Sequence, residues 1–199
     1  MDFTSLNLCQ PLLDALDEIG YVSPTPIQAQ AIPDLIEGRD LLGCAQTGTG
    51  KTAAFALPIL DAMAKDPWGG SRRIRALMMC PTRELASQIR DNIEQYARHL
   101  DIRSMAMFGG VSQRPQEKIL HRGVDILVAT PGRLLDLISQ GYVDLSYVQF
   151  LVLDEGDRML DMGFIRDIRK ILAHIPKNRQ SMLFSATIPR SIVELSRDM

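Results

Sequence analysis

The stretch DLLGCAQTGTGKTAAFALPIL, residues 40–60, decides the fold of this chain. It consists of a short apolar run of strand length, a loop with two glycines, and an apolar segment of helical character. A strand, a glycine-containing loop and a helix in this order can surround a phosphate with backbone N–H groups, in front of the positive end of the helix. This stretch therefore predicts an α/β architecture with an anion site at the turn.

Further apolar runs of strand length recur along the chain, at residues 74–80, 102–108, 124–129, 148–153 and 180–186. Several of them are almost continuously apolar, as is typical of strands buried on both faces of a parallel sheet. The segments between them have helical spacing, and apolar side chains recur on one stripe in residues 83–99 (Leu85, Ile89, Ile93, Tyr96) and in residues 163–174 (Phe164, Ile168, Ile171, Leu172). The pattern predicts one α/β domain over residues 1–199, with a mostly parallel central sheet and helices on both faces.

Composition excludes several classes of protein. An apolar fraction of 46% and a charged fraction of 23% are those of a soluble globular protein. No apolar run approaches the ~20 residues of a membrane span, and no signal peptide is visible. The three cysteines are widely spaced and form no metal-type pair, so we expect a reducing, cytoplasmic location. A net charge of -2 means that nucleic acid would need a local patch.

The loop AQTGTGKT, residues 45–52, carries the first chemical signal. Gly48 and Gly50 let the backbone approach phosphates, Lys51 supplies a cation to the β- and γ-phosphates, and the Thr52 hydroxyl can bind Mg²⁺. The other polar members of the loop are Gln46, Thr47 and Thr49. The generic pattern begins with Gly where this chain has Ala45, so a plain glycine-rich turn is the alternative. The strand–loop–helix context favours a nucleotide site.

The stretch LVLDEGD, residues 151–157, supplies the partner for such a site. A nucleotide loop needs a second strand, beside the first, that ends in a carboxylate for the metal. We expect Asp154 to hold Mg²⁺ through water, and Glu155 to orient or deprotonate the attacking water. The alternative is that these acids only open a helix, because Asp and Glu favour helix N-termini.

Taken together, the motifs resemble a known family. GYVSPTPIQ (20–28) with Phe3 upstream, AQTGTGKT, PTREL (81–85), the Gly109-Gly110 pair, TPGR (130–133), DEGD (154–157) and SAT (185–187) occur in the order of the motifs in the N-terminal RecA-like domain of DEAD-box ATP-dependent RNA helicases. The resemblance covers essentially the whole chain, and DRMLDMGF (157–164) is similar to the bacterial RhlE-like branch. It implies a RecA-like P-loop NTPase fold that binds ATP or ADP with Mg²⁺.

The resemblance also assigns roles near the base of the nucleotide. Gln28 would read the adenine edge with both groups of its amide, a pairing that amide geometry allows. Phe3 would stack on the base, and Thr25 and Pro26 would shape the loop. The alternative is that PTPIQ is only a helix start with Pro26 in its first turn, and the two can hold together.

Three further motifs are the family's RNA contacts in this domain. They follow predicted strands at one sheet edge, which suits contact with the sugar–phosphate backbone without sequence reading. For Arg83 or Arg133 taken alone, a solvated residue at a helix start is the alternative. The residues assigned to RNA are Pro81, Thr82, Arg83, Gly109, Gly110, Thr130, Pro131, Gly132 and Arg133.

The resemblance implies that Asp157, Ser185 and Thr187 couple nucleotide state to RNA. Gly156 departs from the family, which has Ala at this position. Gly costs up to ~1 kcal/mol relative to Ala in a helix. We therefore expect Asp157 to be held less firmly against Ser185 and Thr187, with nucleotide binding unaffected.

Three hypotheses about function follow. The first is one half of an ATP-dependent RNA helicase, whose second RecA-like domain supplies arginines to the ATP site. This chain would then be a monomer that binds adenine nucleotide and Mg²⁺, holds RNA weakly and turns over little ATP. The second is another P-loop enzyme, such as a small kinase or a DNA translocase. The third is a non-catalytic RNA-binding or regulatory module.

Overall fold

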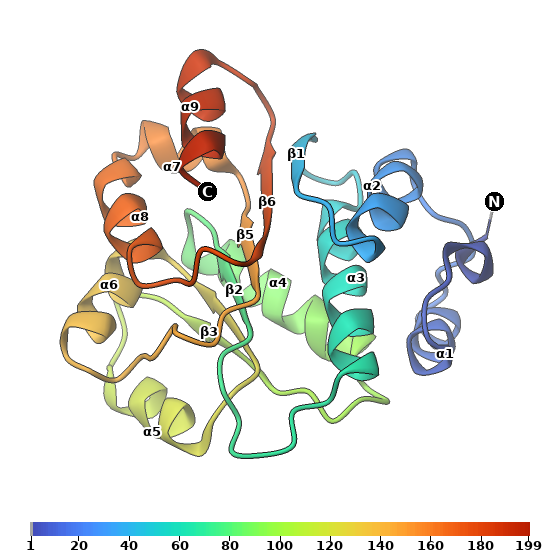
Figure 1. The fold of residues 1–199 in the computed structure, drawn as a ribbon, viewed down its shortest axis with the longest axis horizontal. Helices are drawn as coiled ribbons and strands as arrows, with labels where there is room; N and C mark the ends of the chain where they lie inside the picture. Colours follow the sequence, from blue (N-terminus) through green and yellow to red (C-terminus); the bar gives the residue numbers. More distant parts are fainter. Residues whose placement is uncertain (1) are drawn as a thin grey trace.

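The centre of the molecule is a parallel sheet of six strands in the order β1-β6-β5-β2-β4-β3 (Figure 1). The computed structural model describes residues 2–199. Every neighbouring pair of strands is parallel. The strands are β1 (Leu41–Cys44), β2 (Ala76–Met79), β3 (Ser104–Met107), β4 (Ile126–Ala129), β5 (Phe150–Leu153) and β6 (Gln180–Ser185). Each lies within one of the predicted apolar runs, so the predicted α/β class and the strands are confirmed.

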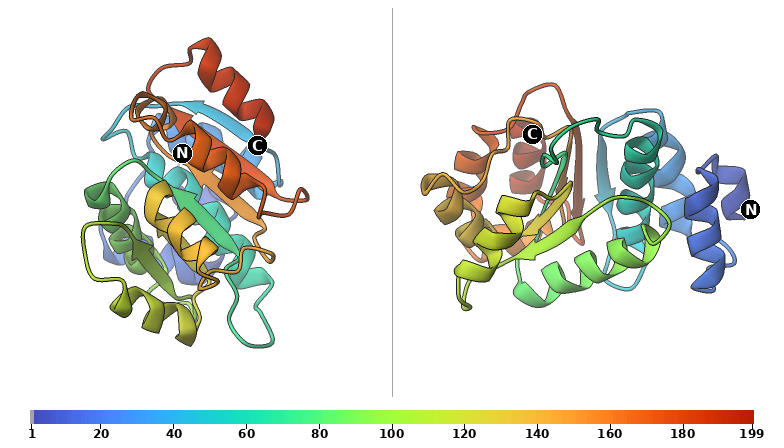
Figure 2. Two further views of the ribbon diagram at one scale, coloured as in Figure 1. Left: turned by 90° about the vertical axis from the view of Figure 1, so that its left-hand side faces the viewer. Right: turned by 90° about the horizontal axis from the view of Figure 1, so that it is seen from below.

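Helices cover both faces of this sheet (Figures 1 and 2). One face carries the 3-10 helix η1 (Phe3–Leu6) and the helices α1 (Gln10–Glu18), α2 (Pro26–Ile36), α3 (Lys51–Lys65) and α4 (Arg83–Tyr96). The other face and its lower rim carry α5 (Arg114–Arg122), α6 (Pro131–Ser139), α7 (Gly156–Asp161), α8 (Ile165–Leu172) and α9 (Arg190–Asp198).

Two hydrophobic clusters fill the space between sheet and helices. Ala76 and Met78 of β2 belong to the cluster under α1 to α4, whereas Leu77 and Met79 belong to the cluster under α6 to α9. All four of these side chains are buried, which explains why β2 reads as a continuous apolar run rather than an alternating one.

The predicted helical stripes face these clusters. In α4, the side chains of Ile89, Ile93 and Tyr96 are buried, and Leu85 is partly buried against the same cluster. In the second stripe, Ile168 and Ile171 of α8 are buried, while Phe164 and Leu172 are partly buried beside them. The segment around residues 65–71 is exposed, as its glycines, proline and charged residues indicate.

The carboxyl ends of β1, β6 and β5 lie side by side at one edge, because Cys44 pairs with Ser185 and Leu153 pairs with Leu183. The expectation that the strand of Asp154 lies directly beside β1 is wrong, since β6 lies between β1 and β5. The chain returns after α8 to insert β6 there, and a crossover of this kind leaves no local signature in sequence.

None of the helices in residues 2–199 combines the length and the apolar character that crossing a bilayer requires.

The packing of β1 on β6 generates a first prediction. A Cβ added at Gly43 would lie 2.8 Å from Cδ1 of Phe184, whose ring is buried and lies 5.4 Å from that of Phe55. Gly43→Ala should therefore lower the free energy of unfolding by about 1–3 kcal/mol, the usual cost of overpacking. Urea denaturation measures this change. Gly69→Ala is the control, because nothing lies within 4 Å of its added methyl, and an equal loss in both variants would contradict the packing argument.

Candidate functional site

The loop 45–50 joins β1 to α3 at the carboxyl edge of the sheet. Gly48 and Gly50 both have a φ of 84°, in the left-handed region that favours glycine. A Cβ on Gly50 would lie 2.5 Å from Nε2 of Gln28, whereas one on Gly48 would meet nothing within 4 Å. Gly50 thus permits a close approach within the protein, and Gly48 leaves open space of the kind that a phosphate fills.

A buried ion pair links this loop to β5. Nζ of Lys51, the first residue of α3, lies 2.8 Å from Oδ1 of Asp154, and their side chains are only 7% and 1% exposed. The structure therefore brings the two predicted residues together across the end of β6. Burial raises the pKa of the Asp154 carboxyl above its ordinary value, and the Lys51 ammonium offsets that rise only in part.

The site fits Mg²⁺ by the chemistry of its oxygens. Oδ2 of Asp154 is buried and has no hydrogen-bond partner in the part of the chain that the structure describes. Thr52 follows Lys51 in the first turn of α3 and is partly exposed. Residues 2–199 contain no group of three or more His, Cys, Asp or Glu side chains that could hold a metal ion. Magnesium commonly binds through one or two protein ligands, water and substrate phosphates, so Asp154 and Thr52 would be enough protein ligands for it.

Glu155 lies in a strained turn between β5 and α7. Its φ of 54° and ψ of 50° are in the left-handed region, which is uncommon for residues other than glycine. Such conformations cost about 1–3 kcal/mol and cluster at functional sites. The Glu155 side chain is mostly buried, and its Oε2 lies 3.2 Å from Nη1 of Arg158.

Gln28 ties the start of α2 to the phosphate loop. It is 3% exposed, its Oε1 accepts from the N–H of Thr25 at 3.0 Å, and its Nε2 donates to the carbonyl of Gly50 at 3.0 Å. Thr25 Oγ1 also donates to the carbonyl of Thr49 at 2.9 Å, and Pro26 is the first residue of α2. PTPIQ therefore does begin a helix, as the alternative interpretation states, and Gln28 is also hydrogen-bonded to the phosphate loop.

A hollow of 500 Å³ lies between the start of α2 and the loop, lined in part by Pro26, Ile27 and Gly48. It is large enough for a small ligand. Phe3 is placed elsewhere: it is only 4% exposed, and its ring lies 6.0 Å from that of Tyr21. Stacking of Phe3 on a base stays a prediction, and so does base reading by Gln28.

The predicted coupling residues meet at the end of β6. The N–H of Asp157 donates to Ser185 Oγ at 3.1 Å, and Thr187 Oγ1 donates to Asp157 Oδ2 at 3.0 Å. Partial burial acts to raise the pKa of Asp157, but hydrogen bonds from Thr187 and from the N–H of Arg158 outweigh it and hold the pKa below its ordinary value. Both hydrogen bonds are present with Gly156 in place, and the expected loosening of Asp157 stays a prediction.

Gly156 lies where α7 packs closely against β6, beside this contact. An added Cβ there would lie 2.7 Å from Cδ1 of Leu183 and 3.3 Å from Cδ1 of Ile192. Glycine therefore lets α7 approach β6 closely, and the short distance brings Asp157 within reach of Ser185 and Thr187.

The motifs assigned to RNA also converge at the carboxyl edge of the sheet. Thr82 caps α4 through a hydrogen bond from the N–H of Leu85 at 3.3 Å, and Thr130 and Pro131 begin α6. Pro81 precedes Thr82 and is buried, while Gly132 lies in the first turn of α6 and is exposed. Two helix N-termini thus face the same edge, where their N–H groups can bind phosphates.

Arg83 and Arg133 frame the exposed glycine turn that follows β3. The Arg83 guanidinium lies 5.2 Å from the centre of the Phe108 ring. Arg133 Nη2 donates to the carbonyl of Val111 at 3.1 Å, while its Nη1 is buried without a partner among the described residues. Gly109 and Gly110, between these anchors, are exposed, and Gly110 has a φ of 76°.

Gln116 of α5 belongs to none of the sequence motifs. It is 7% exposed, and its Nε2 donates to the carbonyl of Phe108 at 3.2 Å. Gln116 therefore holds the beginning of the glycine turn as Arg133 holds its end. The only signal in the sequence is a polar residue at a position that the helix turns toward the sheet, and such a signal is too common to be decisive.

Comparison with known proteins identifies the family. The family described as DEAD/DEAH box helicase matches residues 25–195. This chain belongs to that family. It is 47% identical over 196 residues to the ATP-dependent RNA helicase DeaD of Klebsiella pneumoniae, covering 98% of this chain and 30% of that protein. It is 45% identical over 192 residues to the DEAD-box ATP-dependent RNA helicase CshA of Streptococcus pneumoniae, covering 96% of this chain and 36% of that protein.

A solved structure of a DEAD-box protein from the hyperthermophile Methanococcus jannaschii superposes with a TM-score of 0.92 at 39% identity, over 99% of this chain and 53% of that one. The RecA-like fold implied by the DEAD-box motifs is thereby confirmed. The chain spans only about a third of the length of the two curated relatives. Assignment to the RhlE-like branch stays a prediction.

The contact of Gly156 with Leu183 generates the second prediction. Ala at position 156 gains up to ~1 kcal/mol of helix propensity, but overpacking costs about 1–3 kcal/mol. Gly156→Ala should therefore lower the unfolding free energy by roughly 1 kcal/mol, with little effect on ADP affinity. Urea denaturation and ADP titration measure the two quantities.

Leu183→Val tests the cause, because valine lacks the Cδ1 that the new methyl meets. The double variant should be more stable than the sum of the two single losses predicts. Strict additivity, or a large loss of ADP affinity in Gly156→Ala, would contradict this explanation.

Proposed function

We propose that this chain is the N-terminal ATP-binding half of an ATP-dependent RNA helicase, whose full-length form couples ATP binding and hydrolysis to the separation or remodelling of RNA duplexes. The observation that carries the proposal is the pairing of Lys51 with Asp154 beside a loop whose Gly50 carbonyl is bound by Gln28. A general phosphate loop does not need the hydrogen bond from Gln28 to Gly50. That bond joins the residue proposed to read the base to the loop proposed to bind the phosphates.

Nucleotide binding uses the groups of this chain in a defined way. The N–H groups of the loop hold the phosphates, and Lys51 moves its ammonium from Asp154 to them. Oδ1 of Asp154 would then keep the hydrogen bond from the N–H of Glu155 at 2.9 Å, and its remaining lone pair, together with the unpartnered Oδ2, could accept from water around Mg²⁺. When bound, ATP would supply the phosphoanhydride bond, and Mg²⁺ would supply the positive charge that neutralises the phosphate oxygens. Glu155 then orients the attacking water and accepts its proton.

Turnover by this chain alone should be small. In the family, arginines of a second RecA-like domain complete the ATP site, and an arginine at such a position is worth 10³–10⁵ in rate. Binding of adenine nucleotide is therefore the activity to measure on this piece.

RNA would be held at the carboxyl edge of the sheet by its sugar–phosphate backbone. The N-termini of α4 and α6 and the glycine turn offer backbone N–H groups, with Arg83 and Arg133 beside them. None of these groups reads a base edge, which predicts binding without sequence preference. Asp157, held by Ser185 and Thr187, connects this edge to the strand of Asp154.

We further propose a monomer in the cytoplasm. The cysteines Cys9, Cys44 and Cys80 are free thiols, which suits a reducing compartment. Light scattering during size-exclusion chromatography tests the oligomeric state.

The nucleotide proposal is tested by titrating the chain with ADP and Mg²⁺, in competition with GDP. We expect saturable ADP binding that GDP does not displace. Gln28→Ala removes the two hydrogen bonds that its amide is predicted to make to adenine, worth about 1 kcal/mol each, so ADP affinity should fall roughly 10- to 30-fold. Gln95→Ala, at an exposed position of α4, is the control.

Equal binding of GDP would favour a different P-loop enzyme. RNA binding without any nucleotide binding would favour the non-catalytic module.

The RNA proposal is tested with a fluorescein-labelled uridine oligonucleotide of about six residues. Arg133→Ala removes a cation from the carboxyl edge and the hydrogen bond to Val111. Affinity measured by fluorescence anisotropy should fall roughly 10- to 100-fold, in line with a charged hydrogen bond of about 1.5–3 kcal/mol, while ADP affinity stays unchanged. Arg166→Ala, at an exposed position of α8, should leave both affinities unchanged. A similar loss in that control would reject the carboxyl edge as the binding surface.

A further inference from the structure

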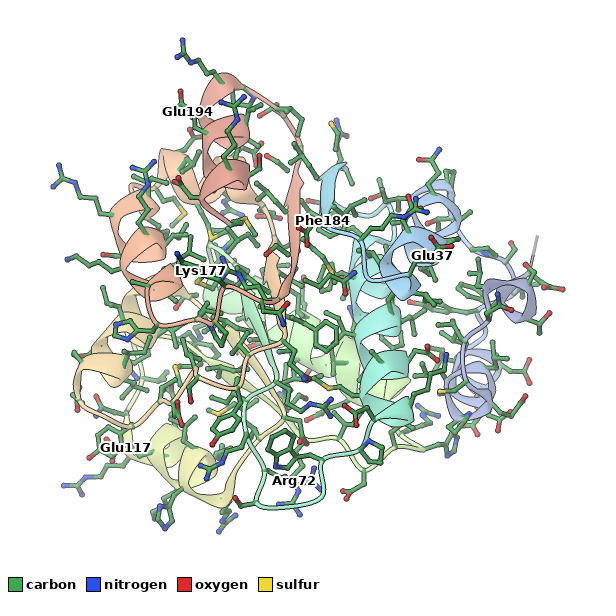
Figure 3. The ribbon with its side chains drawn as sticks, in the orientation of Figure 1. Glu37, Arg72, Glu117, Lys177, Phe184 and Glu194 are labelled. Carbon is green, nitrogen blue, oxygen red and sulfur yellow. The ribbon has the colours of Figure 1, made fainter. Side chains whose placement is uncertain are left out.

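A second charged hollow lies at the opposite, amino edge of the sheet. Arg73 precedes β2, Arg122 ends α5 just before β4, and Tyr142 follows α6; all three line a hollow of 630 Å³. Figure 3 shows this end of the molecule at the bottom, where Arg72 and Glu117 are labelled, far from Glu194 at the top. None of the motifs of the nucleotide or RNA site contributes to it.

Cations dominate this amino-edge hollow. Arg73, Lys118 and Arg122 are exposed, and no carboxylate pairs with any of them in the described part of the chain. The acid among its lining residues, Glu117, accepts a hydrogen bond from Gln113. On a chain of net charge -2, three unpaired cations around one hollow form a local basic patch.

The neighbouring arginines, in contrast, form ion pairs with carboxylates. Arg72 is held by Asp101 and Asp125, and Arg75 is paired with Asp66. The hollow continues into a smaller one that shares Arg73 and Tyr142 and includes Asp144. Asp144 accepts hydrogen bonds from the N–H and the hydroxyl of Ser146, which lower its pKa and keep it charged. The charge of Arg73 also lowers the pKa of Asp144, so Asp144 offsets part of the Arg73 charge, while Lys118 and Arg122 have no carboxylate of this kind beside them in the larger hollow.

Exposed aromatic rings stand beside these cations. Tyr142 is 47% exposed, Tyr147 is 40% exposed and Trp68 is 41% exposed. The Arg73 guanidinium lies 5.2 Å from the centre of the Tyr147 ring, and that ring packs edge-on against Trp68 at 5.6 Å. Among the exposed aromatic side chains of residues 2–199, only Tyr21 lies elsewhere.

We propose that this amino-edge hollow, with the Trp68–Tyr147 pair beside it, is a second RNA-binding surface. Arg73, Lys118 and Arg122 contact phosphates, and unpaired bases stack on the exposed rings. A basic groove with interleaved aromatic side chains is the arrangement that binds single strands without sequence preference. The inference rests on the proposed RNA-binding function and extends it to RNA outside the segment held at the carboxyl edge.

The geometry separates this surface from the first one. Strands of four to six residues at about 3.3 Å each keep the two edges roughly 13–20 Å apart, before the loops are added. A stacked strand of about six residues is itself only roughly 20 Å long at ~3.4 Å per residue. Bound along the carboxyl edge, it has no residues left to pass around the molecule to the amino edge, whereas a longer strand can reach both.

The test compares fluorescein-labelled uridine oligonucleotides of about six and about thirty residues, with affinities measured by fluorescence anisotropy at several salt concentrations. The test variants are Lys118→Glu/Arg122→Glu and, with a milder effect on α5, Lys118→Gln/Arg122→Gln. The matched control is Arg166→Glu/Lys170→Glu, the same charge change at exposed positions of α8. Circular dichroism melting and ADP affinity report whether each variant is folded.

We expect the glutamate test variant to weaken binding of the long RNA at least tenfold and to leave the short RNA and ADP unchanged. The slope of log affinity against log salt concentration for the long RNA should become shallower by about 0.7 for each phosphate that the variant no longer neutralises, or by about 1.4 for two. A long RNA that carries 4-thiouridine should cross-link to Tyr142, Tyr147 or Trp68.

Unchanged long-RNA binding in the folded test variants would overturn the inference, and so would an equal loss in the α8 control. The proposed function fails separately, if Arg133→Ala leaves short-RNA binding unchanged or if the wild type does not bind the short RNA. In either case the response of the long RNA to the test variants still decides whether the amino-edge hollow binds RNA.

Discussion

The ion pair between Lys51 and Asp154 is the contact on which the rest of the site depends. It joins the loop after β1 to the end of β5 across the intervening β6, so three strands must keep their register for it to form. Removing either partner would leave a buried charge unpaired, which is strongly destabilising. The fold and the nucleotide site therefore share one structural requirement.

Because β6 lies between β1 and β5, its end adds Ser185 to the site beside the phosphate loop and Asp154. Ser185 ends β6 and pairs with Cys44 of β1. Its hydroxyl accepts a hydrogen bond from the N–H of Asp157, which lies in the helix that follows β5. A displacement at the phosphate loop can thus reach α7 through a single strand. The close packing at Gly156 and Leu183 leaves little free space between α7 and β6. A displacement of β6 should therefore move α7 with it, because packed cores switch between arrangements rather than deform continuously.

The predictability of this structure differs from residue to residue. Buried parallel strands leave continuous apolar runs, and the loop 45–52 carries its own chemistry, so the sheet and the convergence of Lys51 and Asp154 could be predicted. The insertion of β6 could not, because crossovers are long-range choices. The left-handed conformation of Glu155 and the role of Gln116 depend on tertiary contacts, and Phe3 is buried by neighbours that a motif does not describe.

The hydrogen bonds of Gln28 have a consequence for how a base and a phosphate loop communicate. One amide serves the backbone of α2 and the carbonyl of Gly50 together. A ligand that forms hydrogen bonds with this amide would change the strength of the hydrogen bond between Gln28 and the loop. By thermodynamic reciprocity, the conformation of the loop changes the affinity for that ligand by the same factor. Selectivity for a base would then appear as a difference in how freely the loop opens, in addition to a difference in contact energy.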